Sequence, residues 1–425
     1  MHDMKTTRSS VRLLSRLSLM MFLQYFVQGA YLPIVSVYVE KGLGFSAFAV
    51  GAFGSALAVG PILAPFLIGQ LADRHFATQR LVACCHFAAG VLMIFLYFQT
   101  QVWAVILIGT VYSVLYVPTM MLTNSLAFQH LGDSKSEFPI VRLFGTIGFI
   151  VPAYVVEFYW LRGLAGDELN TARGVVFLIS GVAGLIMALY CLSLPHTPPQ
   201  RKTRDYAPWV ILRLMKERQF LVFVLASFLI GIAHKFFFVW NSPFLRAVLD
   251  SGGWTGAYEQ SISSIGQICE VAVMLVLGFS IARFGFKRVL IAGAAAYAVR
   301  CFLFASVFWL DPAFTAKLTL VAIGQALHGF CFGCFLATGF IFVDRVAPKD
   351  ARGSMQTIYG TMVLGLGFFV GGLFSGWIGT HFTTVTDTST VRDWTSIWAS
   401  CGCLALVVTL GLAVLMPKSG DEATE

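Results

Sequence analysis

Charged residues are scarce in this chain. Asp, Glu, Lys and Arg together make up only 12% of its 425 residues, whereas soluble domains carry about a quarter. Apolar residues take their place, because 57% of the chain is hydrophobic and the mean hydropathy is +0.78. This composition excludes a soluble globular protein and indicates an integral membrane protein.

The chain also lacks the residue groups that would indicate an enzyme or a metal site. Cys331 and Cys334 have the spacing of a metal-binding pair, but no second pair accompanies them and their neighbours are Phe330, Phe332 and Phe335. We interpret these cysteines as small packing residues. We find no plausible nucleophile and base, and therefore predict no enzyme, no cofactor and no metal. No segment is long enough for a soluble signalling domain, which disfavours a non-transporting membrane receptor.

Long apolar runs, each close to the roughly 20 residues that a spanning helix needs, recur along the chain. The first is too long for the core of a signal peptide, so we expect it to be retained as a span. Twelve spans are predicted, at residues 14–38, 46–71, 81–98, 103–130, 139–161, 174–194, 219–249, 258–283, 289–310, 316–343, 354–380 and 395–416.

The basic residues predict an orientation for these spans. The net charge is +8, which in a soluble protein would suggest nucleic acid as a partner. Here twenty Lys and Arg lie in the termini and loops of one side, six lie in the loops of the other, and three lie within spans. Basic residues stay on the cytoplasmic side and meet anionic lipid there. We therefore expect both termini in the cytoplasm of a cell inner membrane, with membrane lipid and not nucleic acid as a partner.

A proline-rich and basic loop divides the chain into two halves. We predict an N-terminal six-helix half over residues 1–195, a cytoplasmic linker with a possible interfacial helix over 196–218, and a C-terminal six-helix half over 219–425. Gly69-Gln-Leu-Ala-Asp73-Arg74, after span 2, has a degenerate counterpart 209 residues later, after span 8. The first copy resembles the loop signature of the major facilitator superfamily. This resemblance implies an all-α fold of twelve transmembrane helices and assigns Asp73 and Arg74 to a cytoplasmic gate.

Polar side chains recur at helical spacing inside several predicted spans, where they are expected to face protein or water instead of lipid. They could be helix–helix contacts, but their distribution over spans 1, 4, 5, 7 and 8 favours a polar cavity between the two halves. The residues that we expect to line it are Gln24, Gln28, Asn124, Arg142, Thr146, Phe149, Lys235, Gln267 and Glu270.

Three of these residues, Arg142, Lys235 and Glu270, carry charge. Arg142 could instead extend to the cytoplasmic headgroups, although Thr146 and Phe149 share its helical face at i, i+4, i+7. A carboxylate at Glu270 could load and release a proton. The alternative is a permanent ion pair of Glu270 with Lys235, Arg300 or Arg142, and we interpret Arg300 itself as structural.

Nearly the whole chain resembles the nucleoside:proton symporters, a branch of the major facilitator superfamily. The resemblance implies that Arg142, Thr146 and Phe149 face a nucleoside from one half, that Gln267 and Glu270 contact its base or ribose from the other half, and that Phe332 stacks nearby. The segments that carry the resemblance are Phe138–Phe149, Tyr116–Thr119 with Asn124, Ser193–His196, Gly266–Glu270, Arg300, His328–Phe332 and Val343-Asp344.

The chain departs from the pattern of this family at Gly333, Lys235, Phe238 and Gln28. Where the family has an aspartate, this chain has Gly333, and Lys235 adds a positive charge, so a more anionic ligand or a different counter-ion scheme stays open. The predicted function is proton-coupled import of nucleosides or a related small polar metabolite by alternating access. The alternative is a symporter of an amino-sugar or peptidoglycan-derived solute. Drug efflux is disfavoured because span 5 lacks the glycine–proline pattern of antiporters.

Overall fold

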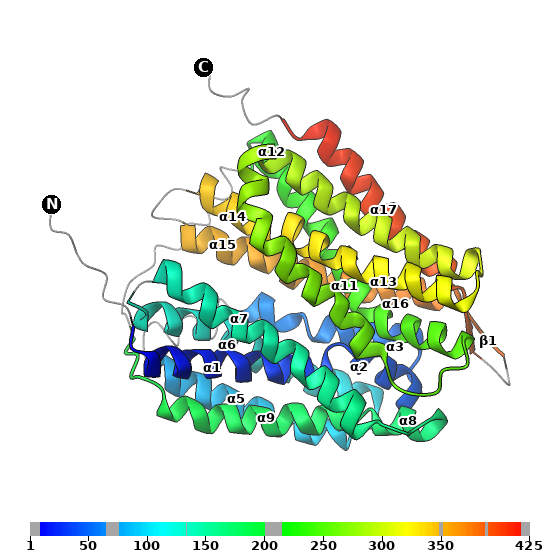
Figure 1. The fold of residues 1–425 in the computed structure, drawn as a ribbon, viewed down its shortest axis with the longest axis horizontal. Coiled ribbons are helices and arrows are strands. Elements are labelled where there is room, and N and C mark those ends of the chain that lie inside the picture. The colour runs from blue at the N-terminus through cyan, green and yellow to red at the C-terminus, as the bar shows by residue number, and fades with distance from the viewer. Residues whose placement is uncertain are drawn as a thin grey trace. The chain divides into compact units, whose positions relative to one another are not determined.

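The structure is a computed structural model that describes residues 9–64, 76–132, 134–199, 215–347, 352–386 and 390–417. Its elements are almost all helices, with one short hairpin (Figure 1). Contacts divide the chain into two compact units, which are described separately here. Unit 1 holds the described residues within Met1–Leu43 and Val59–Thr203, and unit 2 holds those within Gly44–Ala58 and Arg204–Glu425.

Unit 1 is a bundle in which α1 packs against α6, α7 and α9, and α5 packs against α6 and α9. Its helices are α1 Val11–Tyr31, α2 Val35–Val37, α5 Thr78–Tyr97, α6 Val102–His130, α7 Ser134–Val155, α8 Gly166–Ala172 and α9 Val175–Ser193, with π-helical turns η1 Tyr38–Gly42 and η2 Val156–Trp160.

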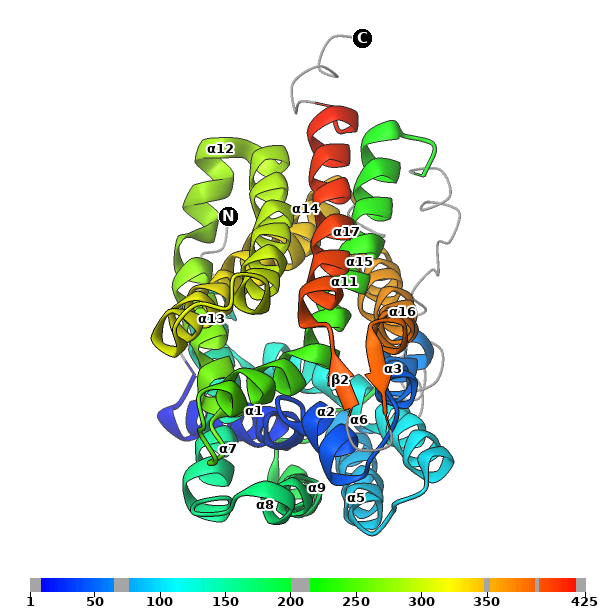
Figure 2. The same cartoon turned by 90° about the vertical axis from the view of Figure 1, so that its right-hand side faces the viewer.

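Unit 2 is a second bundle, in which α12 packs against α13 and α17, and α11 packs against α16 and α17. Figure 2 shows the hairpin of this unit, β1–β2, between the ends of α16 and α17. The elements are α3 Ala47–Ala56, α11 Arg218–Ser251, α12 Glu259–Trp309, α13 Phe314–Phe330, η3 Cys331–Ala337, α14 Thr338–Val346, α15 Arg352–Gly360, η4 Thr361–Gly367, α16 Phe368–His381, β1 Thr383–Val385, β2 Thr390–Arg392 and α17 Trp394–Leu415.

Eleven helices within the described residues are long and apolar enough to cross a membrane. The longest, α12, has 51 residues and breaks at Gly285, whose φ of 76° and ψ of 162° are not helical. It therefore contains the two spans predicted at 258–283 and 289–310, and the predicted all-α architecture of twelve spans is confirmed. The hairpin β1–β2 was not predicted, because three-residue strands leave no periodic signal. The possible interfacial helix within 196–218 falls mostly outside the described residues.

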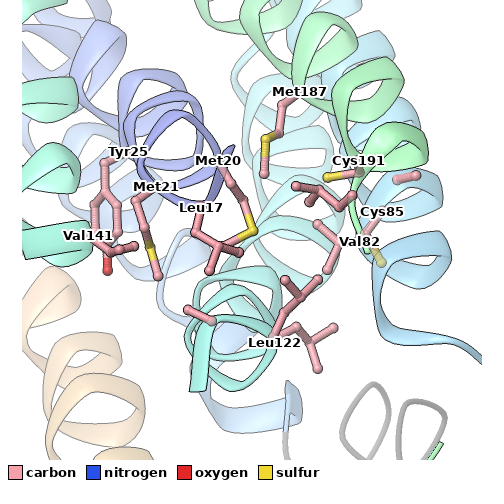
Figure 3. Packing of buried hydrophobic residues seen from close by; sticks show 14 of the residues in the cluster. Leu17, Met20, Met21, Tyr25, Val82, Cys85, Leu122, Val141, Met187 and Cys191 are labelled. Atoms are coloured by element: carbon pink, nitrogen blue, oxygen red, sulfur yellow. The ribbon is translucent and has the colours of Figure 1, made fainter. Parts of the chain in front are cut away.

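The core of unit 1 is an apolar cluster centred on α1 (Figure 3). Leu17, Met20 and Met21 of α1 are fully buried there. Around them lie the side chains of α5, α6, α7 and α9, including Val82, Cys85, Leu122, Val141, Met187 and Cys191. This packing holds α1 between its neighbours and fixes the polar face that α1 presents one turn further along.

Glycines let α1 and α7 pack with their backbones in contact. A Cβ on Gly29 would lie 2.2 Å from the carbonyl oxygen of Phe149, and one on Gly148 would lie 2.2 Å from that of Phe22. Real side chains do not tolerate such distances, so only glycine permits this crossing. The close approach brings the backbone of Phe149, a predicted ligand residue, against α1.

We expect Gly29→Ala to destabilise the protein by about 1–3 kcal/mol, the usual cost of overpacking, because the methyl group would force α1 and α7 apart. Gly411→Ala in α17 is the matched control, since no atom lies within 4 Å of its Cβ position. Thermal unfolding of both variants in detergent measures the difference. Equal melting temperatures would contradict the close crossing.

Residues 44–58, which include α3, pack with the other elements of unit 2. A Cβ on Gly51 of α3 would lie 2.4 Å from the carbonyl oxygen of Gly372 in α16. The Ser55 hydroxyl donates a hydrogen bond of 2.7 Å to the carbonyl oxygen of Phe369. Residues 44–58 therefore belong by sequence to the predicted N-terminal half and by contact to the second unit. The division of the chain into halves at residues 195 and 219 stays a prediction.

Candidate functional site

Three fully buried polar side chains from three helices form a closed network in unit 1. The amide of Gln24, on α1, donates to the Thr119 hydroxyl at 2.9 Å, and its carbonyl oxygen lies 2.9 Å from Nε2 of His86 on α5. Because an amide oxygen can only accept, His86 carries its proton on Nε2. Both polar atoms of Gln24 are thus engaged between helices, and a ligand that contacts Gln24 would have to replace one of these bonds.

Tyrosines fix the same network from α6. The Tyr116 hydroxyl donates to the backbone oxygen of Gln24 at 2.6 Å, and the ring of Tyr116 stacks on Tyr112 with 5.3 Å between centroids. Hydrogen bonds of this kind offset the free-energy cost of burying polar groups in a low-dielectric interior. His86 was not among the predicted site residues, because its pairing with Gln24 joins positions 62 residues apart that no periodicity connects.

Arg142 lies on α7 with its guanidinium carbon 4.2 Å from the centre of the Tyr25 ring. Gly145 leaves room for this contact, since a Cβ there would lie 2.8 Å from Nη1 of Arg142. No carboxylate in the described part of the chain forms an ion pair with Arg142. Arg142, Thr146 and Phe149 are half-buried on one continuous helix, so the structure places the three on one face, as predicted from their spacing.

Gln28 and Asn124 are half-buried in the same unit. The side-chain oxygen of Asn124 is buried and has no hydrogen-bond partner among the described residues. An unsatisfied buried acceptor costs about 1–3 kcal/mol. Asn124 therefore offers an acceptor that a ligand donor could satisfy.

A second polar cluster lies in unit 2, where α11, α12 and α13 meet. Arg300 is fully buried and its Nη1 lies 3.0 Å from Nδ1 of His328. His234 pairs through Nδ1 with the Tyr297 hydroxyl at 2.6 Å, and the His234 and His328 rings lie 5.6 Å apart. Sequence reasoning took Arg300 as structural, and it did not identify His234 or His328 as partners of the site, because the contacts join three helices.

Glu270 lies at the edge of this cluster, with 23% of its side chain exposed. Its Oε2 is 4.0 Å from Nε2 of His328. No ion pair joins it to Lys235 or Arg300 in the described residues of this unit. Gln267 lies one turn earlier on α12, and Phe332 is the second residue of η3; both are half-buried.

Further polar bonds tie the three helices together near Gln267. The Asn241 amide donates to the Ser263 hydroxyl at 2.7 Å, and the Gln325 amide donates to the oxygen of Asn241 at 2.7 Å. Asn241 and Gln325 were also missed, because a single polar residue in an apolar span leaves no repeating pattern. These bonds fix the part of α12 that carries Gln267 and Glu270.

Lys235 lies on α11 where α3 and α16 cross it. A Cβ on Gly54 would lie 3.7 Å from Nζ of Lys235, and one on Gly371 would lie 2.9 Å from its Cβ. Only 5% of Lys235 is exposed, and no hydrogen bond or ion pair joins it to another described residue. A largely buried lysine is costly in an apolar interior, so an anionic group beside Lys235 would be favourable.

The predicted gate residues Asp73 and Arg74 lie outside the described residues. Within those residues, no group of three or more His, Cys, Asp or Glu is arranged to hold a metal ion.

Known proteins similar to this chain are membrane transporters. YegT, a putative nucleoside transporter of Escherichia coli, is 29% identical over 99% of this chain and 96% of its own. The xanthosine permease of Escherichia coli is 28% identical over 90% of this chain and 91% of its own. A crystal structure of a mutant of the nucleoside transporter NupG superposes with a TM-score of 0.85, covering 95% of this chain and 100% of that one, at 25% identity.

The fold is thus that of the major facilitator superfamily, and the relatives are transporters and not enzymes. The model of the family described as "Nucleoside H+ symporter" matches residues 11–421, which is nearly the whole chain. The chain therefore belongs to the nucleoside H+ symporter family.

Proposed function

We propose that the chain is a proton-coupled importer of nucleosides that works by alternating access. The observation that supports this most directly is Glu270, a carboxylate that is partly exposed within a membrane span and lies beside His328. Ionisable groups in such positions are costly, and they are usually retained for transport of ions or protons. In a member of this family, a carboxylate there is suited to take up a proton on one side and release it on the other.

The substrate class is supported by the relatives and by the polar groups of unit 1. The xanthosine permease acts on a nucleoside, as its name states. Arg142 offers several donors with no carboxylate paired to it among the described residues, and Asn124 offers an unsatisfied acceptor. Ribose hydroxyls and the edges of a base supply matching acceptors and donors.

Uptake of radiolabelled uridine, adenosine and xanthosine into cells that express the chain tests this proposal. Accumulation above the external concentration, abolished by a protonophore, is expected for at least one of them. Uptake that is unaffected by the protonophore would contradict proton coupling. No uptake of any nucleoside would contradict the substrate class.

A second candidate, a symporter of an amino-sugar or peptidoglycan-derived solute that carries a carboxylate, is favoured by Lys235. Only 5% of this residue is exposed, and no hydrogen bond or ion pair joins it to another described residue. An anionic group on the ligand would satisfy it.

Lys235→Gln is expected to shift selectivity toward neutral nucleosides without abolishing transport, because glutamine keeps the length and polarity of the side chain and removes its charge. Competition of labelled uridine uptake by neutral and by carboxylate-bearing solutes measures the change. We expect the ratio of their inhibition constants to change about tenfold, which corresponds to a free-energy difference of roughly 1.4 kcal/mol. An unchanged ratio would mean that Lys235 does not contact the ligand.

Membrane placement follows from the same proposal. The excess of basic residues on one side supports a cell inner membrane with both termini in the cytoplasm, and contact of these residues with anionic lipid. Asp73 and Arg74 would then form the cytoplasmic gate between the two halves at residues 1–195 and 219–425.

A further inference from the structure

Arg300, His328 and Glu270 form a row in unit 2, with His328 in the middle. Arg300 Nη1 lies 3.0 Å from Nδ1 of His328, and the opposite ring nitrogen, Nε2, lies 4.0 Å from Oε2 of Glu270. The second distance exceeds that of a hydrogen bond. A modest rotation of the Glu270 side chain, which is 23% exposed, would shorten it to one.

The order of donors in this row fixes the protonation of His328. A guanidinium has only donors and keeps its charge in proteins, so Nδ1 of His328 must accept from Arg300. In the neutral ring the proton then resides on Nε2, which faces Glu270. His328 thus presents an N–H to the carboxylate, and that N–H is polarised by the positive charge behind it.

Packing holds both ends of the row in place. The Arg300 guanidinium lies 4.0 Å over the Phe237 ring, and the His328 ring stacks on Phe237 with 5.2 Å between centroids. Two glycines let α12 and α13 approach at this level. A Cβ on Gly266 would lie 2.9 Å from Cβ of His328, and one on Gly329 would lie 2.7 Å from the backbone nitrogen of Glu270.

Of the other ionisable groups near His328, the cation Arg300 opposes a second proton on its ring. His234 faces it from α11 at 5.6 Å between ring centroids, and its Nδ1 pairs with the Tyr297 hydroxyl of α12. Arg300 faces it from α12, and Glu270 faces it as the sole carboxylate paired with it among the residues described. The thiols of Cys301, Cys331 and Cys401 surround Arg300. A doubly protonated His328 would lose its bond from Arg300 and gain repulsion from it.

We propose that Arg300 and His328 are positioning residues that set the pH at which Glu270 loads its proton, and that His328 itself does not carry the transported proton. This inference rests on the proposed function, in which Glu270 is the proton carrier. A donor that faces a carboxylate favours its charged form. The N–H of His328 therefore favours the ionised form of Glu270, and we expect the proton to load from the acidic side of the membrane.

Two substitutions of His328 test the contacts of its two ring nitrogens separately. In His328→Asn the amide can still accept from Arg300 at the position of Nδ1, but it cannot reach Glu270. In His328→Gln the amide occupies the position of Nε2 and can still donate to Glu270. We expect the midpoint of the pH dependence of uptake to move upward by about one pH unit in the asparagine variant and to stay near that of the wild type in the glutamine variant.

Tyr297→Phe is the matched control, because it removes a hydroxyl from the same cluster and leaves the row intact. Its pH midpoint should not move. An infrared titration of the carboxyl band in purified protein gives a second readout that needs no transport, and the loss of this band in Glu270→Gln assigns it. If His328→Asn does not fold, the same titration of Arg300→Lys decides, with an upward shift expected because lysine does not hold His328 in this orientation.

Active protein with an unchanged midpoint in His328→Asn, or in Arg300→Lys where the first does not fold, would overturn the inference. A pH midpoint that moves equally in the asparagine and glutamine variants would also overturn it. An equal shift would indicate a general packing defect, not the loss of the contact that Nε2 makes with Glu270. Failure of the proposed function would give a different experimental result. In that case Glu270→Gln itself would accumulate substrate with the pH dependence of the wild type.

Discussion

Glu270→Gln is expected to abolish concentrative uptake while preserving binding and some exchange of substrate across the membrane. Glutamine has nearly the same shape and hydrogen-bonding reach as a protonated glutamate, but it cannot release a proton. The carrier would therefore resemble its loaded state at every pH, and substrate could cross without a proton gradient to drive it. We expect accumulation to fall at least tenfold, to the level of equilibration.

The measurement compares proton-driven accumulation with exchange of labelled for unlabelled nucleoside in proteoliposomes. Glu259→Gln is the control on the same helix, because Glu259 lies 3.3 Å from Arg246 in a structural ion pair and should not take part in coupling. The control should retain accumulation even where its stability falls. Full pH-dependent accumulation by the Glu270 variant would remove Glu270 from the coupling role.

Arg142→Ala is expected to eliminate detectable substrate binding. The guanidinium rests on Tyr25 at 4.2 Å and has no ion-pair partner among the described residues, so its donors are available to a ligand. A hydrogen bond from a charged donor contributes about 1.5–3 kcal/mol, which corresponds to roughly 10–150-fold in the dissociation constant. Weak binders such as transported nucleosides would then fall below detection.

Binding to purified protein, measured by calorimetry or by substrate protection against thermal unfolding, tests this prediction. Arg142→Lys keeps the charge but loses the planar pair of donors, so we expect it to bind more weakly than the wild type and better than alanine. The exposed Arg283, which lies 5.8 Å over Phe284, provides a control in which alanine should leave binding intact. Binding by Arg142→Ala as tight as that of the wild type would mean that Arg142 has a structural role.

The sequence by itself determined the membrane class, the number of spans and most of their bounds. These properties are local, because a run of about 20 apolar residues must form a helix in lipid, where backbone groups have no other partners. The predicted span 103–130 corresponds to α6 at Val102–His130, and 395–416 corresponds to α17 at Trp394–Leu415. The common face of Arg142, Thr146 and Phe149 was likewise predictable, since it follows from helical spacing alone.

Only the tertiary structure decided which polar side chains meet. Gln24, predicted to contact the ligand, is bonded to His86 and Thr119, and Glu270 faces His328, which the sequence did not suggest as its partner. Likewise, the segment that contains α3 packs against α16, more than 300 residues away. Hydropathy and periodicity describe one helix at a time, whereas these contacts depend on the glycines that let particular helices approach and on the rotation of each helix about its axis.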